Sequence, residues 1–115
     1  MRILINENKL DKVVGLFMTR VFDELTIVKR GYFKVSTFFV KPDSKVIAEL
    51  YEGSDGQNFL VIDYQLWTTI SDIFGFKTIL DQQESLGKWA NKYFDTKIDL
   101  VDIGDFENLN LHFNN

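Results

Sequence analysis

The side chains with the clearest potential for chemistry are carboxylates near the C-terminal end. After residue 94 the chain has a single base, Lys97, and five acidic residues: Asp95, Asp99, Asp102, Asp105 and Glu107. Grouped carboxylates can coordinate a hard cation, as a metal-dependent hydrolase would require. The spacing lacks the alternating ligands and the glycine of an EF-hand loop. We therefore expect a solvated acidic edge and no metal site here.

Other catalytic residue types are scarce. The chain has no cysteine, and its one histidine is His112. Disulfides and thiolate catalysis are thereby excluded, and no positioned nucleophile or base accompanies His112. The segment 53–56 is rich in glycine, but Gln57 follows it where a phosphate-binding loop needs a lysine. We expect neither enzyme activity nor a cofactor.

A basic and aromatic segment over residues 29–40 is the second candidate site. It partly matches the strand signature of RNA-recognition domains, which needs exposed rings beside basic groups on one sheet face. The nucleic-acid hypothesis uses Lys29, Arg30, Tyr32, Lys34 and Phe38, with Tyr32 and Phe38 stacking a base. Phe33, Lys34 and Thr37 depart from the signature. The competing interpretation packs Phe38 under a helix and uses the lysines to protect a strand edge.

Composition and charge favour one folded domain. The chain has 115 residues, of which 45% are hydrophobic and 15% aromatic, enough for a packed core. Its formal net charge is −4, and residues 1–94 are balanced, so the excess lies at the acidic end. No apolar stretch reaches the length of a membrane span, and the first residues do not form a signal peptide. We expect a cytosolic protein without membrane attachment.

Apolar spacing predicts three helices. Residues 10–25 carry an apolar stripe at intervals of three and four: Leu10, Val13, Val14, Phe17, Met18, Val21, Phe22 and Leu25. A second helix follows Asp63 as its N-cap, has an inner stripe of Leu66, Trp67, Ile70, Ile73 and Phe74, and ends at Gly75. A third follows the cap Thr78 and carries Trp89 and Tyr93. The last two could be a helix-turn-helix, but the acids Asp81 and Glu84 oppose a phosphate backbone.

Between and after these helices the pattern predicts strands. Segments 26–30, 32–40, 45–52 and 58–62 are rich in β-branched and aromatic residues and are separated by turn residues. Alternation places Val46, Ala48 and Leu50 on one face of the third segment. Short strands are also expected at 2–5 and 97–103. The prediction is an α+β domain over residues 1–103, with an antiparallel meander packed against an N-terminal helix and a helix pair, and a closing C-terminal strand.

Two sequence patterns resemble a known group of proteins. Residues 3–10 resemble the I-x-I-T-E-x-Q-L opening of many small proteins of large tailed bacteriophages, departing from it at Asn6 and Lys9. Residues 66–75 match the L-W-x-x-I-S-x-x-F-G pattern that accompanies that opening. The group has no assigned activity and no functional residues to transfer. The resemblance implies a viral protein, used in the virion or against a host factor.

From these features we expect a non-enzymatic phage protein that acts through protein–protein contact, in the virion or in the host cytoplasm. The polar tail, residues 104–115, is the candidate arm that folds onto another chain or a second copy. Its apolar members are Phe106, Leu109, Leu111 and Phe113. The alternative is a single-stranded nucleic-acid-binding module using residues 29–40.

Overall fold

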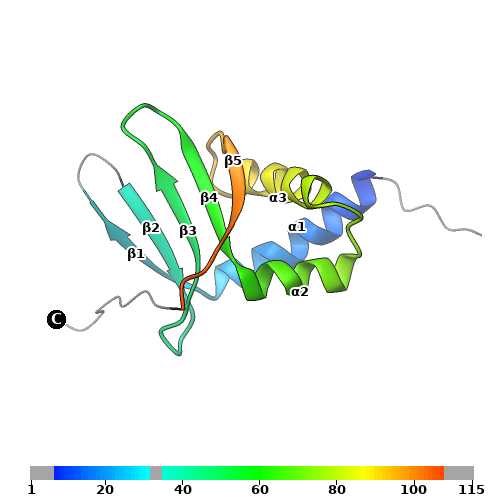
Figure 1. Ribbon diagram of the computed structural model, residues 1–115, viewed down its shortest axis with the longest axis horizontal. Helices are drawn as coiled ribbons and strands as arrows, with labels where there is room; N and C mark the ends of the chain where they lie inside the picture. Colours follow the sequence, from blue (N-terminus) through cyan, green and yellow to red (C-terminus); the bar gives the residue numbers. More distant parts are fainter. Residues whose placement is uncertain (1–6, 32–34, 108–115) are drawn as a thin grey trace, which may run out of the picture.

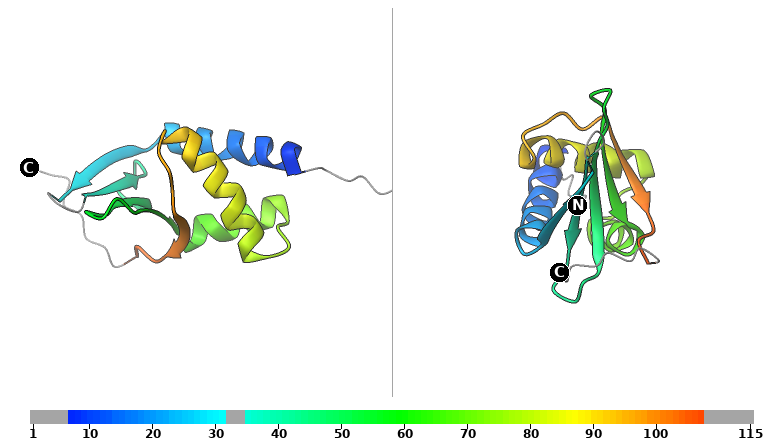
Figure 2. Two further views of the ribbon diagram at one scale, coloured as in Figure 1. Left: turned by 90° about the horizontal axis from the view of Figure 1, so that it is seen from above. Right: turned by 90° about the vertical axis from the view of Figure 1, so that its left-hand side faces the viewer.

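Three helices pack on one side of a five-stranded sheet (Figures 1 and 2), as the computed structural model shows for residues 7–31 and 35–107. In chain order the elements are α1 (Glu7–Asp23), β1 (Thr26–Arg30), β2 (Val35–Val40), β3 (Val46–Glu52), β4 (Asn58–Asp63), α2 (Tyr64–Phe74), α3 (Ile79–Tyr93) and β5 (Leu100–Gly104). The predicted α+β class is confirmed. The strand predicted at 2–5 lies outside the described residues.

The sheet has the strand order β1-β2-β3-β4-β5. β1 to β4 form the predicted antiparallel meander, while β5 lies parallel to β4. Parallel neighbours need a long crossover connection, and here α2 and α3 supply it. The closing strand was predicted from the sequence, but its direction was not.

The predicted helix caps are confirmed. Asp63 accepts a hydrogen bond from the Gln65 backbone N–H (3.0 Å), and Thr78 accepts one from the Asp81 N–H (3.0 Å). Gly75 ends α2 with a φ of 65°, a left-handed conformation that glycine adopts without a steric cost. The two polar caps fix where α2 and α3 begin, and the glycine fixes where α2 ends.

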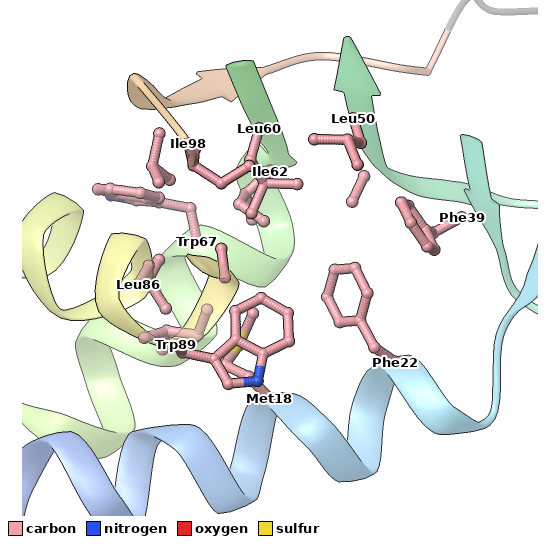
Figure 3. Packing of buried hydrophobic residues seen from close by; sticks show 14 of the residues in the cluster. Met18, Phe22, Phe39, Leu50, Leu60, Ile62, Trp67, Leu86, Trp89 and Ile98 are labelled. Atoms are coloured by element: carbon pink, nitrogen blue, oxygen red, sulfur yellow. The ribbon is translucent and has the colours of Figure 1, made fainter. Parts of the chain in front are cut away.

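The main core lies between the helices and the inner face of the sheet (Figure 3). Met18 is fully buried, and Phe22, one turn later on α1, lies at a junction of rings. The Phe22 ring centroid is 4.9 Å from Trp89 on α3 and 5.0 Å from Phe39 on β2. Tilted and edge-on ring pairs at such distances stabilise beyond their buried area. One residue of α1 therefore joins the helical layer to the sheet.

Two residues of the predicted inner stripes face solvent instead. Val13 is 52% exposed and Ile73 is 55% exposed. Successive residues on a helix are about 100° apart, so Val14 turns to the core and Val13 lies on the flank of α1. On α2, Ile73 likewise lies on the exposed flank, whereas the next residue, Phe74, is half-buried against the core. The stripes predicted from spacing were wider than the surface that the sheet covers.

One buried polar side chain links α2 to α3. Gln82 is 1% exposed; its Nε2 donates to the Trp67 carbonyl (2.9 Å) and its Oε1 accepts from the Ser71 hydroxyl (2.5 Å). Both ends of the amide are therefore satisfied away from water. A buried amide with partners at both ends fixes the mutual position of the two helices.

We expect Gln82→Ala to lower the free energy of unfolding by about 2–4 kcal/mol, because it leaves a cavity and removes both hydrogen bonds. The matched control is Glu84→Ala, on the exposed side of the same helix, with an expected change within about 0.5 kcal/mol. Urea unfolding of the three proteins measures both values. Equal stability of the two variants would show that the Gln82 amide does not hold the helix pair.

Candidate interaction surfaces

The face of the sheet turned away from the helices has its own small core. Phe38, Val40 and Val46 are buried there, with Val28 and Phe106 packed against them. The strand register shifts between Phe39 and Val40, so that Val40 pairs with Val46 while Phe39 pairs with Ala48. Because of this bulge the prediction for Val46 was wrong: it lies with Phe38 on the outer face and not with Ala48 and Leu50.

Phe106 covers this outer core from beyond the end of β5. Its side chain is half-buried and contacts the Phe38, Val40 and Val46 cluster. β5 ends at Gly104, one residue past the predicted limit of the domain. The ring of Phe106 therefore packs on the outer face of the sheet, just after the end of β5.

Gly104 makes this approach of Phe106 sterically feasible. A Cβ at position 104 would stand 2.4 Å from Cγ1 of Val61 and 3.5 Å from the Phe106 ring. The first distance is far inside van der Waals contact with a β-branched side chain of β4. Only glycine therefore lets the chain leave β5 at this point with the Phe106 ring beside it.

The other half of the outer face is open among the described residues. The register aligns Arg30, Ser36, Tyr51, Phe59 and Leu100 in one row across the five strands. Tyr51 and Phe59 stack, with ring centroids 6.1 Å apart and an interplanar angle of 26°. Both are half-buried, and Leu100 at the end of the row is 43% exposed. We call the stacked rings of Tyr51 and Phe59, together with the aliphatic Leu100 that follows them in the row, the aromatic stripe.

The described residues of the nucleic-acid hypothesis, Lys29, Arg30 and Phe38, do not all lie on one face of the sheet. Lys29 and Arg30 are exposed on β1 but point to opposite faces, as consecutive strand residues must. Phe38 is 8% exposed, and it packs under Phe106 rather than under a helix. Its ring therefore offers no open face to a base. Tyr32 and Lys34 lie outside the described residues, so their part of the hypothesis stays a prediction.

The acidic residues after α3 make separate local contacts. The Asp99 carboxylate accepts from the Asn58 backbone N–H (2.8 Å) and lies 3.9 Å from the Lys97 amine. Asp105 accepts from the backbone N–H of Glu107 (2.9 Å) in a local turn. Within residues 7–31 and 35–107 no three acidic or histidine side chains are grouped to hold a metal ion. His112 and the rest of the tail, including Leu109, Leu111 and Phe113, lie outside the described residues.

A second surface follows the polar contacts between α1 and α3. Asp11 binds both Ser85 (2.9 Å) and Lys88 (3.1 Å), and the Trp89 indole N–H donates to the Thr19 hydroxyl (3.1 Å). At the far end the Tyr93 hydroxyl donates to Asp23 (2.7 Å). Burial, that hydrogen bond and the nearby negative charge raise the pKa of Tyr93 from 10.0 to about 12.

Comparison with known proteins gives no relative from which a role can be transferred. The chain matches no protein-family model, no curated protein and no solved structure. The resemblance to phage proteins therefore stays a prediction, and the role of both surfaces rests on their geometry. In the part of the chain that the structure describes, none of the helices has the length and apolar character to span a bilayer.

We expect Phe106→Ala to lower the free energy of unfolding by about 1–3 kcal/mol, because it uncovers Phe38, Val40 and Val46. Ile79→Ala is the control: that side chain is 61% exposed, and its loss should cost less than about 0.5 kcal/mol. Chemical unfolding provides the comparison. A Phe106→Ala protein as stable as the wild type would mean that the ring does not hold the C-terminal segment to the sheet.

Tyr93 predicts a pH dependence of stability. In the unfolded chain the phenol ionises near pH 10, but in the folded protein it keeps its proton to about pH 12. The folded state binds more protons between these values, so the stabilisation is present below pH 10 and is lost as the pH rises toward 12. Urea midpoints of the wild type should fall more steeply in this window than those of Tyr93→Phe. If the urea midpoints of the two proteins fall equally with pH, the raised pKa of Tyr93 is contradicted.

Proposed function

We propose that this chain is a non-enzymatic phage protein that works by binding another protein, as a component of the virion or as an inhibitor of a host factor. The observation that carries the proposal is the outer face of the sheet. It has a packed half, closed by Phe106, and an open half, the aromatic stripe of Tyr51, Phe59 and Leu100. Aromatic residues within a polar surround are typical of the centre of protein interfaces.

The C-terminal segment supplies the rest of the contact in this proposal. Phe106 anchors the chain on the outer face, and Leu109, Leu111 and Phe113 follow it in alternation with polar residues. That period of two suits an extended segment with one apolar side. A specific interface buries about 800 Å² on each partner, more than a stripe of three side chains offers. In this proposal the segment therefore extends the contact surface that the stripe begins.

Replacing the three apolar residues of the segment tests the proposal. The variant Leu109→Asn, Leu111→Asn, Phe113→Asn keeps the length and retains Phe106. Its control is Asn108→Ser, Asn110→Ser, Asn114→Ser, which changes only polar positions of the same segment. We expect both proteins to unfold like the wild type, and only the apolar variant to lose association.

Association is measured in two ways. Sedimentation velocity over a range of concentrations reports self-association, and affinity capture from a bacterial lysate, identified by mass spectrometry, reports hetero-association. A partner held by the wild type and by the control but lost from the apolar variant supports the proposal. Equal association of all three proteins, or none by either measurement, contradicts it.

A titration with short single-stranded RNA at two salt concentrations addresses the nucleic-acid alternative. Lys29 and Arg30 are exposed, whereas Phe38 is buried, so we expect weak binding at most. Tight binding that falls steeply as salt rises would replace protein contact by nucleic-acid contact as the function of this chain.

A further inference from the structure

A groove runs between α1 and α3, on a surface separate from the outer face of the sheet. Its volume is about 770 Å³. Lys12 and Leu16 form the α1 wall, and Lys88 and Lys92 form the α3 wall. Trp89 lies at its base, where its indole N–H is already bonded to Thr19. In the left view of Figure 2, α1 (blue) and α3 (yellow) extend beyond the sheet, and the C-terminal end of α3 lies beside α1.

The groove is basic on a chain that is acidic. Three lysines and one aspartate line it, which makes a local charge of +2, while the whole chain carries −4. Lys88 is bound to Asp11, but Lys12 and Lys92 are exposed and form no ion pair with any side chain that the structure describes. A local charge opposite to that of the molecule selects partners that carry carboxylates.

The groove also has an apolar component. Leu16 is 61% exposed on its wall, although it is a large aliphatic residue in the middle of a helix. Next to it on α1, Gly15 leaves a notch, because an added Cβ would still be 3.8 Å from Cδ1 of Trp89. A methyl group would therefore fit at position 15, and close helix packing does not require the glycine. The notch is space that an apolar side chain of a ligand can fill.

We propose that the α1–α3 groove binds an acidic, amphipathic helical segment of a partner protein. The apolar side of that segment lies over Leu16 and the notch at Gly15, and its carboxylates face Lys12 and Lys92. From Lys12 to Thr19 the α1 wall is about 10 Å long, which matches two turns of a bound helix. Helical segments held by apolar anchors in a groove between helices are a common mode of peptide recognition.

One observation favours an acidic helix over a nucleic acid. Trp89 is only 6% exposed, so its ring cannot act as a stacking platform for bases. An aliphatic side chain needs no such open ring face.

The test uses the full chain and synthetic peptides of about 16 residues with leucine at positions i, i+3, i+4 and i+7. One fluorescein-labelled peptide has glutamate at the other positions, and its sister has lysine there. We expect saturable binding of the acidic peptide, followed by fluorescence anisotropy, and a loss of roughly tenfold or more in affinity for Lys12→Glu, Lys92→Glu. The matched control Lys41→Glu, Lys77→Glu makes the same change of charge outside the groove and should bind within about twofold of the wild type.

Gly15→Ala distinguishes binding in the groove from general electrostatic attraction, because it fills the notch without changing the charge of the protein. We expect its melting temperature to equal or exceed that of the wild type, since alanine favours a helix, while its affinity for the acidic peptide falls. The proposal is overturned if the acidic peptide does not bind, if the sister peptide binds equally well, or if the control loses as much affinity as the groove variant. Tighter binding of a single-stranded DNA of equal charge would overturn it in favour of a nucleic-acid site.

Discussion

The meeting of rings around Phe22 is the constraint on which the rest of the structure depends. Phe22 contacts Phe39 of the sheet and Trp89 of α3, and Phe94 just after α3 lies 5.4 Å from Phe39. α1, α3 and β2 are therefore held at one point by flat, inflexible side chains. Both surfaces derive from this junction. It fixes the angle between α1 and α3, and this angle produces the groove between them. It also keeps the helices on one face of the sheet, so that the other face stays free of helices.

The sequence predicted the elements well because their signals are local. Asp63, Thr78 and Gly75 act on the backbone within a few residues, and each does in the structure what its chemistry predicts. The alternation of side chains along β2 likewise accounts for Phe38 and Phe39 lying in the cores on opposite faces of the sheet. Local hydrogen bonds and side-chain periodicity need no knowledge of the distant chain.

The failures arise where distant segments decide the outcome. Val46 lies on the other face because of a bulge between β2 and β3, and no residue type in either strand predicts that bulge. Phe38 is covered by Phe106, which is distant in the sequence, so a ring that resembled a stacking platform is part of a core. The α1–α3 groove was missed as well, because its lysines come from two helices that are far apart in the sequence and only the fold brings them together.

The parallel position of β5 bears on how the chain folds. The meander β1 to β4 forms between neighbours in sequence, but Asn58 and Asp99, which hold β5 to β4, are 41 positions apart. Closing so long a loop costs entropy until the intervening helix pair has formed, so we expect β5 to dock after β1 to β4 have paired. Phe106 follows β5 and can reach the outer core only at that stage. Before that stage Phe38 and Val40 lack the cover of Phe106, so we expect this face of the sheet to be prone to aggregation in a newly made chain.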